Sequence, residues 1–497
     1  MSNSKLKKVS FEDALMMTGF GKFNYRMLLL VSSIIMGMVF EIFSVSFLVT
    51  ASSCELGTIS SQQGLMAATP LVGIILSSHF WGYLADTKGR RRVLRWELIS
   101  GFTAGFLATF SPNWIVFILL KFASSCGVAG TYALALTLLG ECTPHHKRSL
   151  LVALTSSIFL VCTGVMAIFT IPVLPLKFSY YIPFLGIYFN SWRLLNLSYC
   201  MPCALSAVGI HYVPESPKYL LSAGEEEMAL EILRDINAVN KGRNVDFKVE
   251  SLILDEESAR RGKEGLWSSI ISQTTPLLKP PLLSKTLLLS LMFVIVYFCL
   301  NPYMVWLPYI SDGIMRASET GDSNFTFCEM LQTSLNAGAN KVSDCVLDKT
   351  AMIMVFGIDL LLAVMNGILT VVMAFCGRKP LLITMQLVAG TAGLLVNASS
   401  NWIISIVLFI VYLSGTLNYG FLATVTVDVF PTYVKAMALC LTLMVGRGSS
   451  VLGINILKEL LSNQCELSFY CFAGLTMVGG LLGFLLPSEK KTKEVGS

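Results

Sequence analysis

Two long apolar runs are joined by the stretch Gly82-Tyr83-Leu84-Ala85-Asp86-Thr87-Lys88-Gly89-Arg90-Arg91-Arg92, and this stretch decides the fold class. A turn with this much charge belongs outside the hydrocarbon of a bilayer, where charged side chains are costly. Glycine allows a reversal within a few residues and a close approach of two helices. Asp86 can accept hydrogen bonds near the positive end of a helix, and the arginines favour the cytoplasmic side. The stretch therefore predicts a cytoplasmic turn between two membrane-spanning helices.

The composition places the chain in a lipid bilayer. It has 497 residues, of which 54% are hydrophobic and 13% charged, and its mean hydropathy is +0.68. These values exclude an ordinary soluble globule. A helix needs about 20 residues to cross about 30 Å of hydrocarbon. Twelve apolar segments approach that length: Arg26 to Thr50, Met66 to Leu84, Val93 to Phe110, Trp114 to Leu138, Leu150 to Pro172, Trp192 to Val213, Thr286 to Leu307, Met352 to Phe375, Leu381 to Ala398, Trp402 to Val425, Lys435 to Ile456 and Ser468 to Leu486.

The basic residues predict the orientation of these spans. The first apolar run follows polar or mixed residues and lacks a small-residue cleavage site, so we expect a cytosolic N-terminus and no removable signal. With twelve spans the C-terminus is then cytosolic too, and every basic cluster falls on that side. The clusters are Lys88 to Arg92, Lys147-Arg148, Lys218 to Lys285, Arg378-Lys379 and Lys490 to Lys493. The net charge of +5 reports this topology, and no nucleic-acid partner is expected.

Two short motifs that recur in the second half of the sequence indicate an internal duplication. Gly89-Arg90 recurs as Gly377-Arg378, and Glu141, Pro144 and Arg148 recur as Asp428, Pro431 and Lys435, at offsets that agree to within one residue. The sequence thus predicts an all-α membrane protein with twelve transmembrane helices in two pseudo-symmetric six-helix bundles. The predicted parts are a cytosolic segment (1–25), the first bundle (26–213), a cytosolic linker (214–285), the second bundle (286–486) and a cytosolic tail (487–497).

The linker predicts a short amphipathic helix and no catalytic site. Ser222-Ala223-Gly224-Glu225 has the spacing of a capping box, and an apolar stripe follows at Ala229, Leu230, Leu233 and Ile236. We expect this stripe to pack beneath the bundles. The linker has no phosphate-binding glycine loop and no metal-ligand spacing, and the whole chain has only four histidines. We therefore expect no enzyme activity, no cofactor and no metal site.

The predicted outer loop from Pro308 to Thr350 carries two modification signals. Asn324-Phe325-Thr326 is an N-glycosylation acceptor sequence. Cys328 and Cys345 share this loop, and an oxidising compartment permits them to form a disulfide, with Cys54 and Cys465 as competing partners.

Four ionisable residues lie inside predicted spans, where each needs a partner or a wet cavity. Glu41 lies about 22 Å up the first span and Lys121 about 10 Å below the outer edge of the fourth, at similar depth. Asp359 is near that level, and Arg447 is near the middle of its span. One interpretation is ion pairs that hold helices together. The other is that Glu41 meets a cationic solute or a coupling proton, while Arg447 attracts an anionic group or stabilises Glu41.

Aromatic residues supply further candidates for a cavity. The seventh span contains Tyr297 and Tyr303 near a kink expected at Asn301-Pro302. Tyr132 and Tyr419 lie in other spans. Ordinary packing is the alternative for each, and anchoring at the lipid interface is a further alternative for the aromatic residues of the seventh span.

Several segments resemble the synaptic vesicle glycoprotein two branch of the major facilitator superfamily, whose sugar and organic-ion porters share part of the pattern. They are Ala14 to Tyr25, Ser191-Trp192-Arg193, Pro214-Glu215-Ser216-Pro217-Lys218-Tyr219-Leu220, Ala238-Val239-Asn240 and Phe430-Pro431-Thr432. The charged turn with Gly82, Asp86, Gly89 and Arg90 is similar to the superfamily signature. The resemblance implies alternating access around a cavity lined by spans 1, 4, 7 and 10. It also implies that Asp86, Arg90, Glu141, Arg148 and Glu215 form a latch that holds the outward-open state.

The chain departs from that family at four positions and in one loop. Ala374, Asp428 and Lys435 replace the Asp, Glu and Arg of the second-half pattern, and Lys121 stands where Arg is usual. We therefore expect a weaker latch in the second half. The outer loop is much shorter than the luminal domain of the synaptic vesicle glycoproteins.

The leading hypothesis is a monomeric secondary transporter for a small organic solute, with organic ions among the candidates and a proton as the candidate coupling ion. The alternative is a protein of transporter fold that acts in vesicle trafficking or partner binding. Either would be an integral multi-pass protein of the plasma membrane or a vesicle membrane.

Overall fold

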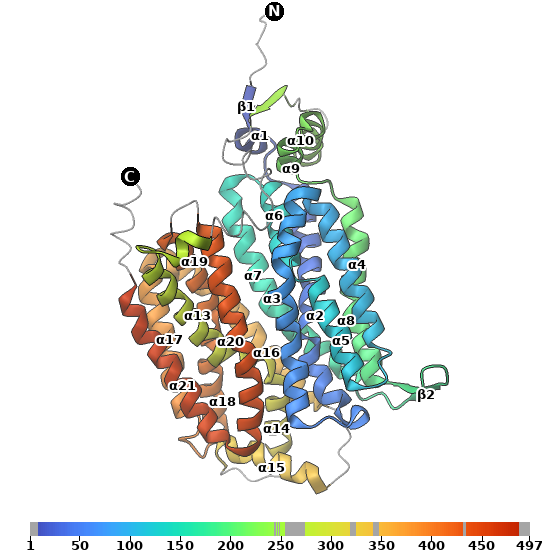
Figure 1. Ribbon diagram of the computed structural model, residues 1–497, viewed down its shortest axis with the longest axis vertical. Coiled ribbons are helices and arrows are strands. Elements are labelled where there is room, and N and C mark those ends of the chain that lie inside the picture. Colours follow the sequence, from blue (N-terminus) through green and yellow to red (C-terminus); the bar gives the residue numbers. More distant parts are fainter. Residues whose placement is uncertain are drawn as a thin grey trace, which may run out of the picture.

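The computed structural model describes residues 8–242, 245, 247, 249–253, 274–318, 325–340, 347–430 and 434–486. It shows two helical halves joined by a linker (Figure 1). The charged stretch 82–92 joins two helices, as predicted, but the turn itself is short. Residues 82–88 belong to the end of the first helix and residues 90–92 to the start of the second, and Gly89 between them has a φ of 98°. A residue with a side chain rarely adopts that conformation, which accounts for the glycine.

The N-terminal half contains six predicted spans. The helices are α2 (Lys22–Leu56), α3 (Ser60–Lys88), α4 (Arg90–Ala108), α5 (Trp114–Gly127), α6 (Thr131–Glu141), α7 (His145–Val173) and α8 (Ser191–Gly209), followed by η1 (Ile210–Tyr212). The fourth span is broken between α5 and α6. A hairpin of antiparallel strands, β2 (Ser179–Ile182) and β3 (Ile187–Asn190), joins α7 to α8.

The C-terminal half repeats this pattern with different breaks. Its elements are η3 (Thr275–Leu278), α13 (Leu283–Val305), α14 (Leu307–Ser318), α15 (Phe327–Asn340), α16 (Lys349–Cys376), α17 (Arg378–Leu395), α18 (Trp402–Leu413), η4 (Ser414–Leu417), α19 (Asn418–Val429), α20 (Lys435–Asn463), α21 (Cys465–Leu482) and η5 (Gly483–Leu485). Within the described ranges, ten spans are long and apolar enough to cross a membrane. The other two predicted spans are α4 and α17, whose basic first turns lower their hydropathy.

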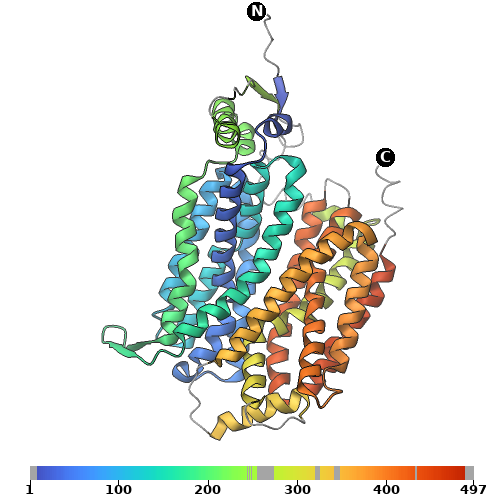
Figure 2. The same ribbon diagram turned by 180° about the vertical axis from the view of Figure 1, so that it is seen from behind.

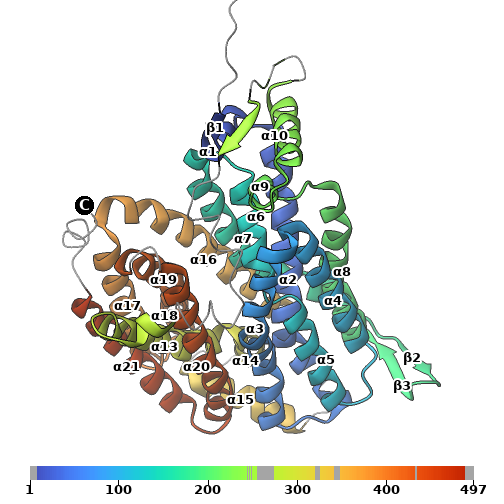
Figure 3. The same cartoon turned by 45° about the horizontal axis from the view of Figure 1, so that its top comes forward.

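The two halves meet along two helix pairs, α7 with α16 and α3 with α20 (Figure 3). They diverge toward the end that carries both termini, here called the termini face (Figures 1 and 2). The burial of α16 follows this shape. Buried residues recur from Ala351 to Ala363, whereas no described residue from Val364 to Cys376 is buried. At the other end the halves touch closely, since a Cβ added at Gly64 would lie 2.8 Å from the Asn455 side-chain oxygen.

A small module covers the termini face of the first half (Figure 1). Strand β1 (Lys8–Ser10) pairs in parallel with β4 (Ser251–Ile253), beside α1 (Phe11–Met17), α9 (Pro217–Ser222) and α10 (Glu226–Lys241). The predicted amphipathic helix is thus present as α10. Its stripe does not pack beneath the bundles as expected, because Phe11, Leu15 and Leu252 close a separate core over it. The capping-box prediction is also wrong, because Ser222 ends α9 and Glu225 precedes α10.

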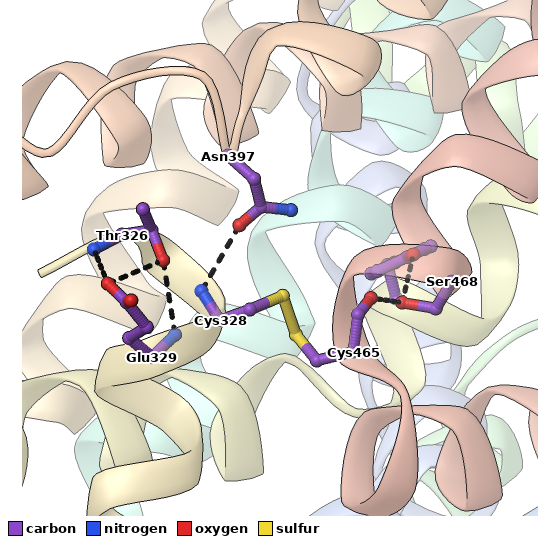
Figure 4. The surroundings of a disulfide bond; sticks show 7 residues. Thr326, Cys328, Glu329, Asn397, Cys465 and Ser468 are labelled. Carbon is purple, nitrogen blue, oxygen red and sulfur yellow. Dashed lines mark hydrogen bonds between the residues drawn. A yellow bond between two sulfur atoms is a disulfide. The ribbon is translucent and has the colours of Figure 1, made fainter.

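The end opposite the termini carries a disulfide and is here called the disulfide face. Cys328 of α15 is bonded to Cys465 at the start of α21, with a Cα–Cα distance of 5.6 Å (Figure 4). The predicted pairing of Cys328 with Cys345 is therefore wrong. The prediction paired two cysteines of the same loop. Folding instead brings the start of α21 against α15, so that the bonded cysteines are 137 residues apart in the sequence. Cys54 is also disulfide-bonded, and Cys345 lies outside the described residues.

The predicted glycosylation site, Asn324, also lies outside the described residues. The adjacent Thr326 is described, and its hydroxyl donates to a carboxylate oxygen of Glu329 at 2.9 Å (Figure 4). Asn397 accepts a hydrogen bond from the Cys328 backbone N–H at 3.1 Å. This contact fastens the loop after α17 to the disulfide.

The pairing of Cys328 with Cys465 can be tested directly. Peptide mapping without reduction should recover a cross-linked peptide that joins Cys328 to Cys465. Cys328→Ser, Cys465→Ser and the double variant should lower the melting temperature in detergent by similar amounts, because each loses the same cross-link. Recovery of both residues as free thiols would contradict the pairing.

Candidate functional site

The two charges predicted at similar depth meet inside the first half. Glu41 of α2 and Lys121 of α5 are each 1% exposed, and Lys121 Nζ lies 3.6 Å from Glu41 Oε2. Lys121 also donates to Ser44 Oγ at 2.9 Å, and Ser124 Oγ donates to Glu41 Oε2 at 2.7 Å. These contacts provide each charge with a buried partner.

A glycine makes room for this ion pair. A Cβ added at Gly105 of α4 would lie 2.3 Å from Glu41 Oε2 and 2.6 Å from Oε1. The carboxylate therefore points between α4 and α5 in the first half, rather than into the space between the halves. The contacts favour the structural interpretation of Glu41 and Lys121 over a binding site for a cationic solute.

A cluster of tyrosines lies where the two halves face each other. Tyr297 of α13 stacks on Tyr419 of α19, with ring centroids 4.4 Å apart and planes 23° apart. Tyr132 of α6, in the other half, is near enough to Tyr297 for an electrostatic interaction, and its hydroxyl lies 3.5 Å from Ser156 Oγ. The hydroxyl of Tyr419 is buried and has no hydrogen-bond partner within the described residues.

Arg447 lies beside this cluster on α20. Gly446 faces α13, since a Cβ there would lie 2.8 Å from the Tyr297 ring, and Asn455 faces α3. Leu452 is 63% exposed and marks the outer side of the helix. With about 100° of rotation per residue, Arg447 falls between the directions of α13 and α3, away from Leu452. It therefore faces the space between the halves.

The Arg447 guanidinium is partly buried, and it forms no ion pair or hydrogen bond with any residue that the structure describes. Among the predicted charges it differs from Glu41 and Lys121, which neutralise each other. A guanidinium stays charged in proteins, so it needs water or an anionic group inside a membrane.

Asp359 lies at the contact between the halves. It is 2% exposed, and a Cβ added at Gly164 of α7 would lie 3.1 Å from the Asp359 Cβ. The hydroxyl of Thr163, also of α7, lies near its carboxyl and donates to the Leu160 carbonyl oxygen at 3.0 Å. No cation interacts with it among the described residues.

Tyr303 does not line the space between the halves, contrary to the expectation. It is fully buried among Phe409, Tyr412, Phe469 and Phe472, and its hydroxyl lies 3.3 Å from Ser468 Oγ. Helix α13 ends at Val305, and at this height its aromatic face turns into the second half.

Three buried charges went unnoticed in the sequence: Glu97, Arg193 and Lys458. Glu97 of α4 accepts hydrogen bonds from Gly130 N at 3.0 Å and from the Thr131 hydroxyl at 3.2 Å, and so bridges the break between α5 and α6. Lys458 of α20 lies 3.4 Å from the centre of the Tyr309 ring. The signal was present, since each is a charged residue inside or beside an apolar segment.

The predicted latch residues assemble on the termini face. Arg90 Nε lies 3.3 Å from Glu141 Oε2, and an Arg90 terminal nitrogen lies 3.2 Å from Asp86. Glu215 accepts from the backbone N–H of Arg91 at 2.8 Å. A Cβ at Gly89 would lie 2.6 Å from Glu215 Oε2. These contacts bind the turn to α6 and to the start of the linker.

Gly82, which we also expected to act in the latch, and Arg148 behave differently. A Cβ at Gly82 would meet nothing within 4 Å. Arg148 pairs with Glu12 of α1 at 2.8 Å and donates to the carbonyl oxygen of Gly140 at 2.7 Å. In this conformation the described latch contacts stay within the first half, the linker and the N-terminal module. The divergence of the halves at this face explains why none reaches the second half.

Comparisons with known proteins define the class. A family model described as "Sugar (and other) transporter" matches residues 30–495, so the chain belongs to this family of the major facilitator superfamily. Among solved structures, the partially occluded inward-open conformation of the xylose transporter XylE from E. coli matches with a TM-score of 0.68 and 15% identity, over 94% of this chain and 99% of that one. Its inward-open conformation gives a TM-score of 0.64 at 15% identity, over 92% and 96%.

The curated relatives point to one branch of the superfamily. The putative transporter svop-1 of Caenorhabditis elegans is 26% identical over 55% of this chain and 50% of that protein. The synaptic vesicle 2-related protein of Xenopus laevis is 28% identical over 54% and 46%, and the synaptic vesicle glycoprotein 2C of Rattus norvegicus is 27% identical over 45% and 30%. The chain matches 50% of the length of the first relative and 46% of the length of the second.

The ion pair predicts a specific pattern of stability. Glu41→Gln and Lys121→Gln should each lower the melting temperature in detergent, because one buried charge loses its partner, a loss typically worth about 3 to 5 kcal/mol. The double variant should recover much of the loss, because both charges are gone. Additive losses in the double variant would contradict the pairing.

The turn predicts a local effect at Gly89. Gly89→Ala should destabilise the protein, because its φ of 98° strains a residue with a side chain and the new Cβ would crowd Glu215. Gly82→Ala is the control, seven residues earlier near the end of α3, with open space around it. Equal melting temperatures for the two variants would refute this account.

Proposed function

We propose that the protein is a secondary transporter that moves a small organic anion by alternating access. The observation that carries the proposal is Arg447, a cation that faces the space between the halves and has no counter-charge among the described residues. A permanent charge at mid-membrane depth is costly without a partner. A carboxylate or similar group on the solute would provide that partner through charge-assisted hydrogen bonds.

The neighbouring aromatic rings support an organic solute. Tyr297 and Tyr419 form a stacked pair beside Arg447, and such rings provide flat apolar contact with polar edges. The buried hydroxyl of Tyr419 has no partner in the described part of the chain, so a solute can satisfy it. Cation, apolar surface and free hydroxyl together suit an organic anion better than an inorganic one.

Glu41 is not part of the proposed solute site. Its carboxylate is bonded to Lys121 and Ser124 within the first half. A proton remains the candidate coupling ion, since a structurally similar protein is titled a proton:xylose symporter. No phosphate-binding glycine loop occurs in the sequence, which favours an ion gradient as the energy source.

The orientation completes the proposal. We assign the termini face to the cytosol, because the basic clusters predict it. The halves diverge at that face, so this conformation is inward-facing. Support comes from the similar structures titled partially occluded inward open and inward open. The predicted latch would then form its contacts with the second half only in the outward-facing state.

A trafficking or partner-binding role is the second candidate. The module formed by α1, α9, α10, β1 and β4 favours it, since this unit has its own core on the termini face. The names of the synaptic vesicle relatives also suggest it. Uptake of a solute by the purified protein, with no other protein present, would argue against this as the sole role.

Uptake into proteoliposomes tests the proposal. A panel of labelled organic anions, cations and neutral sugars should show uptake of one or more anions. Arg447→Gln should weaken that uptake roughly tenfold to a hundredfold, since a hydrogen bond to a charged group is worth about 1.5 to 3 kcal/mol. Arg447→Lys should retain part of it.

The matched control removes a different cation from the same helix. Lys458 of α20 lies over the Trp306 and Tyr309 rings, away from the tyrosine cluster. Lys458→Gln should leave the apparent affinity for the anion unchanged in well-folded protein. Uptake confined to cations or neutral solutes, or equal affinity in Arg447→Gln, would overturn the proposal.

A further inference from the structure

Asp359 is buried at a place where burial depends on the conformation of the whole molecule. It lies ten residues into α16 from the disulfide face, or about 15 Å along the helix. Gly164 of α7 faces Asp359 and lets the two helices approach closely. A Cβ added at Gly164 would lie 3.1 Å from the Asp359 Cβ. The two helices belong to different halves. An outward-facing state, open at the disulfide face, must separate them here and admit water.

The surroundings of Asp359 are neutral. From α7 it meets Gly164 and the Thr163 hydroxyl. On α14, which also packs against α16, the charged residues are Asp312 and Arg316, paired with each other at 2.8 Å. Asp312 also accepts from the backbone N–H of Asp348 at 2.6 Å, which places it at the first turn of α16. Within the described residues, α17 and η4 bring no charge against Asp359.

An ionised carboxylate cannot be buried there without a large cost. One neutral hydroxyl does not compensate for the lost hydration of a full negative charge, and none of the described cations lies beside it. The contrast with Glu41 is direct, because Lys121 neutralises that carboxylate in place. The Asp359 carboxyl must therefore be neutral whenever α7 and α16 are packed together.

We propose that Asp359 is a proton-binding site between the two halves, and that the disulfide face closes only when this carboxyl carries a proton. The proton comes from the compartment at the disulfide face while that face is open. It returns to the same compartment when the face reopens. Asp359 thus senses the acidity of that compartment, and acidity there shifts the protein toward the inward-facing state. This consequence rests on the alternating access proposed above.

The sign of the pH dependence follows from linkage. Closing the disulfide face binds one proton at Asp359, so a lower pH favours the closed state. In the range where only the closed form is protonated, the closing equilibrium should change about tenfold per pH unit. A change that weakens closure tenfold without touching the carboxyl should move the midpoint about one pH unit lower.

Hydrogen exchange of the full chain in nanodiscs, without solute, measures this equilibrium. The reporters are peptides from the disulfide-face ends of α3 and α20, which lie in contact through Gly64 and Asn455. Exchange at each pH is divided by the intrinsic rate. The parent protein should show progressively stronger protection as the pH falls. Asp359→Asn mimics the neutral carboxyl and should be protected at every pH.

Three variants separate Asp359 from other causes. Glu97→Gln removes another buried carboxyl that lacks a cation, but one enclosed in a single half, and should keep the parent pH response. Asp312→Asn should keep it too, although burial raises the pKa of that carboxyl. Gly164→Ala retains the carboxyl but crowds the contact, so its midpoint should move to lower pH. This last variant tests the inference even where Asp359→Asn fails to fold.

Three results would overturn the inference. They are corrected exchange in the parent that does not vary with pH, a parent-like response in Asp359→Asn, and loss of the response in Glu97→Gln or Asp312→Asn. The outcome is separable from the transport proposal. A pH response in a protein that moves no anion would refute the transport proposal alone, and anion uptake without the response would refute this inference alone.

Discussion

The cost of charge inside a bilayer is the constraint on which the rest of this structure depends. The buried ionisable groups meet it in several ways. Glu41 and Lys121 neutralise each other within the first half, and Glu97 accepts hydrogen bonds at a helix break. Arg447 and Asp359 have no counter-charge within the described residues. Both of these lie between the halves, where a solute, water or a proton can supply what the protein does not.

This division separates charges enclosed in one half from charges that lie between the halves. In the alternating access proposed above, charges satisfied inside one half would hold that half together while the halves move. Charges left unsatisfied between the halves respond to the relative position of the halves. Arg447 faces the separated region and Asp359 the packed one, so solute and proton would act on different regions of the same interface.

Glycine placement lets the helices meet as the charges require. Gly105 leaves space for the Glu41 carboxylate, Gly164 for the approach of α16, and Gly89 for Glu215 at the turn. In each place a methyl group would come within about 3 Å of a neighbouring atom, which a packed interior does not tolerate without movement. The sequence shows these glycines, but only the partner helix explains them.

Apolar length and periodicity in the sequence predicted the larger architecture correctly. Apolar length gave the helical membrane fold and its two halves, and the stripe at Leu230, Leu233 and Ile236 gave helix α10. Equal depth brought Glu41 and Lys121 together in the prediction as in the structure. The position of a residue along a helix can be calculated from the sequence, because a helix rises by a fixed amount per residue. The prediction failed where it required the direction a side chain faces, as at Tyr303, whose helix turns it into the second half.

The sequence by itself thus determined that the chain has the helices of a membrane protein and that it consists of two halves, and it singled out Glu41 and Lys121 as charges inside apolar segments. These properties follow from local composition and from helix geometry. Tertiary structure alone decided that Cys328 pairs with Cys465, that Glu41 faces α5 and that Arg447 has no counter-charge among the described residues. Such contacts join residues far apart in the chain, and they depend on how whole helices rotate and pack against one another.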